Sequence, residues 1–218
     1  MTLHEELAEF TSKSASYLTP ERASVYTHQA EALVTSDILR KALRTGDAAP
    51  LFELPDAHGT TVRLEDLLLG GPVILSFYRG SWCPYCNLEL QALQRELDNV
   101  TDTAAQLVAV SPNKPDVSAD LVEKLGLSFA VLSDIGSQVA DAFGIAFEVL
   151  PELRELYEAA GRNLGEMNGS EEWVLPVPAT YVIDQTGTIR YDFVELDYRK
   201  RAEPSEVVAA AASLTALA

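Results

Sequence analysis

Apolar residues in the first 45 positions recur at the spacing of a helix. Leu3, Leu7 and Phe10 are four and three residues apart, which places them on one helical face. A Thr-Pro-Glu sequence at residues 19–21 has the N-cap, first-turn proline and first-turn acid that begin many helices. Residues 1–45 are therefore predicted to form a helical N-terminal extension.

The second helix of this extension is expected to run to about Arg44, with Gly46 as its C-cap. Its apolar stripe consists of Val25, Leu33, Ile38 and Leu39. We expect this stripe to pack on the rest of the chain or on a second subunit, so a homodimer is one predicted assembly. The extension contains no cluster of residues that suggests catalysis.

From Asp47 onward, segments with strand patterns alternate with helical ones. Short apolar strands are predicted at 73–78, 106–110, 130–132, 180–183 and 188–194, and helices at 84–99, 116–125, 137–143, 152–160 and 204–214. Residues 161–173 read as a polar loop, and residues 184–187 as a hairpin turn. This alternation predicts one α/β domain over residues 46–218, with a mainly parallel sheet between helices and an antiparallel edge.

Composition narrows the class of protein. With 218 residues, 47% of them hydrophobic, the chain can form a core without a disulfide or a structural metal. A net charge of −17 makes nucleic acids and anionic membrane surfaces poor partners. The chain shows no signal-like start and no apolar stretch of ~18 residues, so we expect a cytoplasmic protein. Cytoplasmic thiols are usually reduced, which favours reactive over structural cysteines.

The chain has two cysteines, Cys83 and Cys86, between a predicted strand and the start of a predicted helix. A helix N-terminus presents free N–H groups and a partial positive charge, and both stabilise a thiolate. Pro84 suits the first helical turn, where its missing N–H costs nothing. A second thiol three residues on can close a disulfide, so the pair is predicted to be redox-active.

Three other interpretations of the pair are weaker. A zinc site would need two more ligands, and His4, His28 and His58 lie far away in sequence without a pattern. A static disulfide is uncommon in the cytoplasm, and two inert cysteines would be unusual at a helix start. Sulfur alone can carry the redox chemistry, so no metal or cofactor is implied.

Several segments occur in an order that a known family shares. They are 47–56, Gly59, 62–64, 73–78, 107–112, 132–134, 142–144 and 180–190. Their order resembles the alkyl hydroperoxide reductase / thiol-specific antioxidant family, the peroxiredoxins, over about residues 46–210. The resemblance implies a thioredoxin fold and reduction of hydrogen peroxide or organic hydroperoxides. It also implies regeneration by a thioredoxin-like or low-molecular-weight thiol reductant.

The chain departs from the family pattern at the cysteines. In typical peroxiredoxins, Phe-Tyr-Pro leads to a threonine and then to the peroxidatic cysteine. Here Arg79 replaces the proline, Cys83 replaces the threonine, and Cys86 takes the peroxidatic position. The position of the family's second active-site arginine is occupied by Pro178.

These departures resemble thioredoxins and glutaredoxins instead. The sequence Trp82-Cys83-Pro84-Tyr85-Cys86 is similar to their active sites, and residues 177–180 are similar to the cis-proline segment that faces the cysteines in thioredoxins. A cis Pro178 would leave a strand edge for a substrate chain, whereas the alternative is an ordinary proline at the start of a strand.

Two enzymatic mechanisms follow from these resemblances. In a peroxidase, the Cys86 thiolate attacks the peroxide and Cys83 condenses with the resulting sulfenic acid. Arg79 would then hold the thiolate, although it could equally be a solvated surface residue. In thiol–disulfide exchange, Cys83 attacks from the accessible helix tip, Cys86 resolves, and Trp82 shapes the docking surface. A non-enzymatic module, in which oxidation switches the helical extension, is a third hypothesis.

Overall fold

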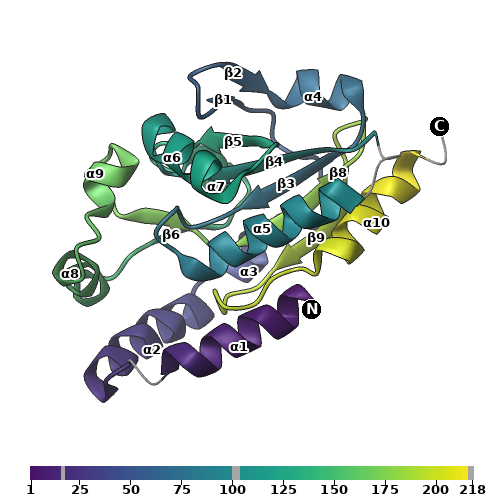
Figure 1. The fold of residues 1–218 in the computed structure, drawn as a ribbon. Helices are drawn as coiled ribbons and strands as arrows, with labels where there is room; N and C mark the ends of the chain where they lie inside the picture. The colour runs from purple at the N-terminus through teal and green to yellow at the C-terminus, as the bar shows by residue number, and fades with distance from the viewer. Residues whose placement is uncertain (16–17, 100–103, 216–218) are drawn as a thin grey trace.

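The computed structural model describes residues 1–15, 18–99 and 104–215, and its centre is a five-stranded mixed sheet (Figure 1). The strand order is β5-β4-β3-β8-β9. Strands β3 (Val73–Phe77), β4 (Gln106–Ser111) and β5 (Ala130–Ser133) are parallel, and β8 (Ala179–Ile183) and β9 (Ile189–Val194) form the antiparallel side. All five strands lie close to their predicted positions, including the hairpin that joins β8 to β9.

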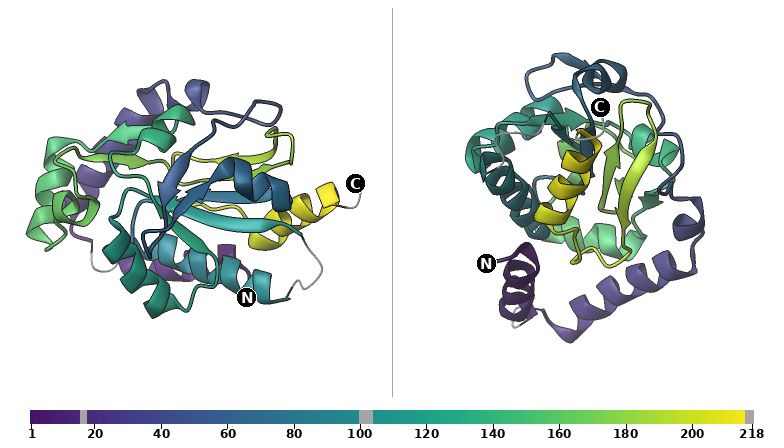
Figure 2. Two further views of the ribbon diagram at one scale, coloured as in Figure 1. Left: turned by 90° about the horizontal axis from the view of Figure 1, so that it is seen from above. Right: turned by 90° about the vertical axis from the view of Figure 1, so that its right-hand side faces the viewer.

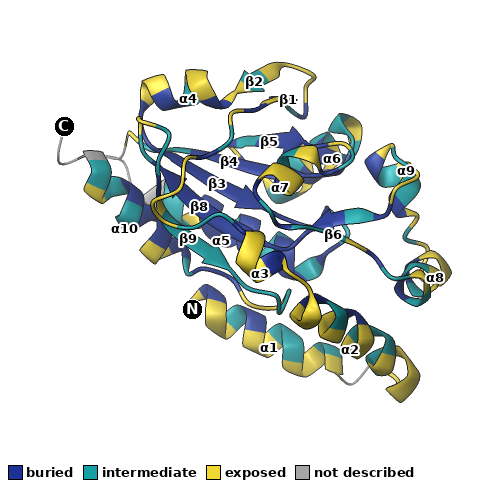
Figure 3. Ribbon diagram, turned by 180° about the vertical axis from the view of Figure 1, so that it is seen from behind, coloured by how far each residue is buried: buried dark blue, intermediate teal, exposed yellow. Residues whose placement is uncertain are grey.

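Both faces of this sheet are covered, and most of its residues are buried (Figure 3). Alternation along β3 sends Ile74 to one face and Leu75 to the other. Helices α5 (Pro84–Asn99), α6 (Pro115–Leu125) and α10 (Pro204–Thr215) cover the first face, and α4 (Leu64–Gly70) and α7 (Gln138–Ala142) cover the second. The continuous apolar runs predicted for β3 and β4 follow from this two-sided burial.

Smaller elements surround the sheet. Strands β1 (Glu53–Pro55) and β2 (Thr61–Arg63) form one antiparallel pair, and β6 (Ala146–Glu148) and β7 (Val174–Pro176) form another. Helix α8 (Pro151–Ala159) matches its prediction. The polar loop predicted over residues 161–173 is wrong in part, because it contains helix α9 (Leu164–Asn168), which Asn163 caps by accepting a hydrogen bond from the backbone of Glu166.

The N-terminal extension is helical, with α1 (Leu3–Ala15), α2 (Pro20–Thr35) and α3 (Ile38–Lys41). The predicted end of the second helix near Arg44 is wrong, because α2 stops before Ser36. The backbone N–H and the hydroxyl of Ser36 both donate to the carbonyl of Leu33, and this local bonding competes with continuation of the helix. Gly46 lies in a later turn and caps no helix.

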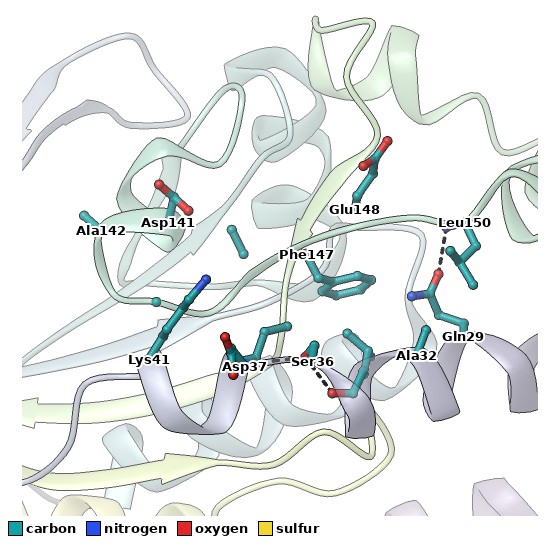
Figure 4. A pocket seen from close by; sticks show the side chains of 14 residues that line it. Gln29, Ala32, Ser36, Asp37, Lys41, Asp141, Ala142, Phe147, Glu148 and Leu150 are labelled. Carbon is teal, nitrogen blue, oxygen red and sulfur yellow. Dashed lines mark hydrogen bonds between the residues drawn. The ribbon is translucent and has the colours of Figure 1, made fainter.

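The extension packs on the rest of its own chain, along the outside of the sheet layers (Figure 2). Leu3 and Leu7 of α1 are buried against α5 and α10, and the Glu203 carboxylate accepts hydrogen bonds from the first N–H groups of α1. Gln29 of α2 accepts from the backbone N–H of Leu150 at 2.9 Å (Figure 4). The division at residue 45 and the homodimer stay predictions.

The apolar stripe of the extension divides between core and surface. Leu33 and Ile38 are buried in the main core, Val25 packs against a separate cluster around α8, and Leu39 is 46% exposed. Most of the stripe is therefore covered within one chain. In the described part of the chain, no helix has the length and apolar character to cross a membrane.

We predict that Gly144 is required for the extension to dock. Gly144 has a φ of +72°, and a Cβ there would lie 2.3 Å from the Lys41 carbonyl oxygen. Gly126 has a similar φ of +65° but open space around it, so it is the matched control. Both alanine variants incur backbone strain, and Gly144→Ala should lower the free energy of unfolding by about 2 kcal/mol more than Gly126→Ala, measured by urea denaturation. Equal losses would contradict this role.

Candidate active site

The cysteines lie where β3 turns sharply into α5. Gly80 has a φ of +135°, which favours glycine, and its carbonyl accepts from the backbone N–H of Cys83 at 3.1 Å. The Asn113 side chain accepts from the N–H of Ser81 at 2.7 Å and donates to Asn168 of α9 at 2.7 Å. The turn is thus held by the segment after β4 and by a helix that the sequence did not predict.

Both thiols are free and buried: Cys83 is 1% exposed and Cys86 is 0% exposed. The expectation that Cys83 lies at an accessible helix tip is therefore wrong. Helix α1 covers this end of α5, where Phe10 packs edge-on against the ring of Tyr85 with centroids 5.1 Å apart, and Thr11 donates to the Tyr85 hydroxyl. A cavity of about 280 Å³ lies between this cover and Cys83.

Arg201, which the sequence did not suggest as a site residue, contacts Cys86. Its Nη2 donates to the Cys86 sulfur at 3.2 Å, and its Nε donates to a Glu89 oxygen at 2.5 Å. Its Nη1 donates to the carbonyls of Tyr198 and Lys200. Arg201 comes from the segment before α10, so no sequence spacing could indicate it, whereas Glu89 follows Cys86 by one helical turn.

Glu89 is buried beside this cation. Burial raises the pKa of its carboxyl to about 7, although the charge of Arg201 and hydrogen bonds from Arg201 and Thr180 oppose the rise. The negative charge of a Cys86 thiolate would raise the pKa further. Glu89 and Cys86 therefore compete for one positive charge.

Arg79 is also buried, at 4% exposed, so the alternative of a solvated surface arginine is wrong. Its Nη2 donates to the Tyr157 hydroxyl at 2.6 Å. Its guanidinium lies 4.9 Å from the ring centre of Trp82 and 4.7 Å from that of Tyr198. Aromatic rings thus hold this positive charge in place beside Cys83.

The two sulfurs titrate as a pair joined by a hydrogen bond. Burial acts to raise the pKa of Cys83. The hydrogen bond from the Cys86 thiol and the positive charges of Arg79 and Arg201 outweigh burial and lower that pKa to about 6. The pKa of Cys86 is raised, because Cys86 is buried and its proton is held toward the Cys83 thiolate. Cys83 is therefore the sulfur that loses its proton more easily.

The other predicted site residues take different places. Pro84 begins α5, Trp82 is half-buried against Tyr157, and Tyr85 is buried against Tyr198. Pro178 is buried directly before β8, and the peptide bond before it is trans, so of the two alternatives the ordinary proline at a strand start is confirmed. The backbone on either side is extended, as a trans proline at the start of a strand allows. Among the described residues, no group of three or more His, Cys, Asp or Glu side chains is placed to hold a metal ion.

This fold, with a buried dithiol at the start of α5, defines a thioredoxin-fold thiol protein. The chain belongs to the AhpC/TSA family, whose model matches residues 45–192. Its solved structural relatives include the peroxidoxin BcpB from Mycobacterium tuberculosis, with a TM-score of 0.61 and 26% identity over 81% of this chain and 99% of that one. The predicted fold class and family are thereby confirmed.

Curated proteins similar to this chain are named as peroxiredoxins or as a thiol-disulfide oxidoreductase. The chain is 34% identical to peroxiredoxin Bcp of Escherichia coli over 47% of this chain and 65% of Bcp, so the match spans about two thirds of that protein's length. It is 31% identical to the putative peroxiredoxin Rv2521 of Mycobacterium tuberculosis over 67% of this chain and 82% of the relative. It is 33% identical to the thiol-disulfide oxidoreductase ResA of Halalkalibacterium halodurans over 49% of this chain and 60% of ResA.

We predict that the reduced protein forms one thiolate per chain as pH rises through about 6. A lowered pKa means that this thiolate is present above that pH and lost below it. Thiolate absorbance at 240 nm should therefore show one step near pH 6 and a second at much higher pH. Cys83→Ser should remove the first step, and a first step that survives in Cys83→Ser but not in Cys86→Ser would reverse the assignment.

The ion pair between Arg201 and Glu89 gives a second prediction. Arg201→Gln leaves a buried carboxylate without its cation, so the free energy of unfolding at pH 8 should fall by about 3–5 kcal/mol. Adding Glu89→Gln should restore most of this loss, as urea denaturation can measure. The single variant should also raise the pKa of Cys83, because the charge of Arg201 lowers it. A double variant as unstable as Arg201→Gln would rule out a buried charge as the cause.

Proposed function

We propose that this protein is a thiol-dependent peroxidase that reduces hydrogen peroxide or organic hydroperoxides through Cys83 and Cys86. The observation that carries the proposal is a buried dithiol whose Cys83 sulfur lines a small cavity that Arg79 also lines, with the charge of Arg79 lowering the pKa of Cys83. A peroxide is small enough to enter such a cavity, and a thiolate is the form of cysteine that attacks it. The names of the relatives from Escherichia coli and Mycobacterium tuberculosis support the same activity.

The cycle assigns a role to each sulfur. The Cys83 thiolate attacks the O–O bond, takes one oxygen as a sulfenic acid, and releases the other, after protonation, as water or an alcohol. The Cys86 thiol then displaces the sulfenic oxygen as water and closes a disulfide. An external thiol reductant returns the disulfide to two thiols. We expect the cycle to run in the cytoplasm, where thiol reductants are abundant.

This assignment differs from the family pattern, in which the position of Cys86 is peroxidatic. Both sulfurs are buried, but Cys83 lines the cavity and has a lowered pKa, whereas the pKa of Cys86 is raised. Arg201 is placed to stabilise Cys86 whenever it becomes a thiolate, as it does when the disulfide is reduced. These features favour Cys83 as the attacking sulfur and Cys86 as the resolving one.

Thiol–disulfide exchange is the second candidate. A nucleophilic Cys83 with a resolving Cys86 suits it equally well, and the match to ResA supports it. Exchange with a protein substrate, however, requires a sulfur that a second protein can touch. The cover of α1 over both sulfurs makes peroxide the better substrate.

We predict that the reduced protein reacts rapidly with hydrogen peroxide in stopped-flow tryptophan fluorescence, because Trp82 adjoins the site. The fast phase should be lost in Cys83→Ser. It should remain in Cys86→Ser, which stops at the sulfenic acid. A phase lost only in Cys86→Ser would make Cys86 the attacking sulfur. No phase in the wild type, with rapid reaction toward a protein disulfide, would favour exchange.

A further inference from the structure

The cavity beside Cys83 is lined by positively charged side chains, which is unusual in such an acidic protein. The whole chain has a net charge of −17, yet the cavity lining contains Arg79, Arg162 and Arg199. In the described part of the chain, no Asp or Glu lines this cavity. The rest of the lining is mainly aromatic and aliphatic, so a positive, half-apolar chamber lies above a nucleophilic sulfur.

Two of these arginines have no acidic partner. Arg79 uses Nη2 for the Tyr157 hydroxyl, and its buried Nε has no hydrogen-bond partner. Arg162 is half-buried and lies 6.0 Å from the ring centre of Tyr157, and among the described residues it has no ion pair with a carboxylate. Arg199, in contrast, makes two hydrogen bonds with Asp197, at 2.8 and 2.9 Å. The Arg79 Nε is a buried donor without an acceptor, which is uncommon, and the half-buried Arg162 has no acidic partner among the described residues, so both can donate to an anionic ligand.

The burial of Cys83 limits what can reach its sulfur. About 280 Å³ lies at the lower end of the range for small-molecule sites. A protein reductant would have to bring its own cysteine to a sulfur that is 1% exposed under α1. A small thiol needs no such displacement of α1.

We propose that this chamber binds a low-molecular-weight thiol that bears a carboxylate, and that such a thiol, in preference to a protein dithiol, reduces the Cys83–Cys86 disulfide. The inference rests on the proposed function only in requiring that the pair cycles between dithiol and disulfide. Arg79 and Arg162 would receive the carboxylate and place the thiol over Cys83.

The reduction balances with two molecules of the thiol. The first, as a thiolate, attacks the Cys83 sulfur, forms a mixed disulfide and breaks the bond to Cys86, which leaves as a thiolate beside Arg201. The second thiolate attacks the sulfur of the bound thiol, forms the small disulfide and releases Cys83 as a thiolate. The two thiol protons remain with the protein pair or the solvent.

The first test compares small thiols of different charge. The full-length protein is oxidised with diamide, and its reduction is followed by tryptophan fluorescence with 3-mercaptopropionate, 2-mercaptoethanol or cysteamine. After correction for the fraction of thiolate, we expect the anionic thiol to react roughly tenfold faster than the cationic one. Arg162→Gln should reduce this preference severalfold. Arg63→Gln, which removes the same charge from the exposed hairpin β1–β2, should leave it unchanged.

The second test compares a protein reductant with a small thiol. Reduced thioredoxin should react with the oxidised wild type more slowly than an equal concentration of 3-mercaptopropionate. Phe10→Ala removes the ring that packs on Tyr85. This variant should accelerate reduction by thioredoxin more than reduction by the small thiol. The proposal is overturned if the three thiols react equally, if Arg162→Gln and Arg63→Gln behave alike, or if thioredoxin is the faster reductant of the wild type.

These tests separate the inference from the peroxidase activity, because diamide forms the disulfide without any peroxide. A protein that shows the charge preference but ignores peroxide would contradict the proposed function and support the anionic thiol site. A protein that reacts rapidly with peroxide but shows no charge preference would support the proposed function and contradict the anionic thiol site.

Discussion

The buried guanidinium of Arg201 is the interaction on which the dithiol site depends. It joins the segment before α10 to α5, and it contacts both the Cys86 sulfur and the Glu89 carboxylate. Three groups that would each be costly to bury alone are stable together, because one positive charge compensates whichever of the two acids is ionised. The same charge helps to lower the pKa of Cys83. Stability and reactivity thus have a common physical origin.

A second constraint is the cover that α1 places over this charge cluster. The cover removes the sulfurs from bulk water, which strengthens every electrostatic interaction around them. It also limits access to a small, positively charged chamber, in a chain whose overall charge is strongly negative. The extension lies almost entirely outside the part of the chain that matches the AhpC/TSA family. Part of the cover over the dithiol therefore comes from residues outside the family's matched part.

The α/β class, the five central strands and the cysteine pair could all be predicted from local sequence. A short apolar run such as that of β3 suits a strand buried on both faces, and two cysteines at a helix start have a distinctive chemistry. Errors arose where local and tertiary signals compete. Ser36 ends α2 by local hydrogen bonds, and α9 is too short for its apolar period to be visible. Local sequence allows a cis or a trans bond before Pro178, and the structure has the trans bond.

The sequence by itself determined the fold class, the family and the two reactive residues, because these depend on periodicity and on short, ordered motifs. Only the tertiary structure decided which sulfur has the lowered pKa. That choice depends on Arg201, which is 115 residues from Cys86 in sequence, and on the aromatic rings that hold Arg79. It also decided that Cys83 is enclosed, because burial sums contributions from segments that have no sequence relation to each other. Charge and access at the sulfur are long-range properties, and chain order carries no signal for them.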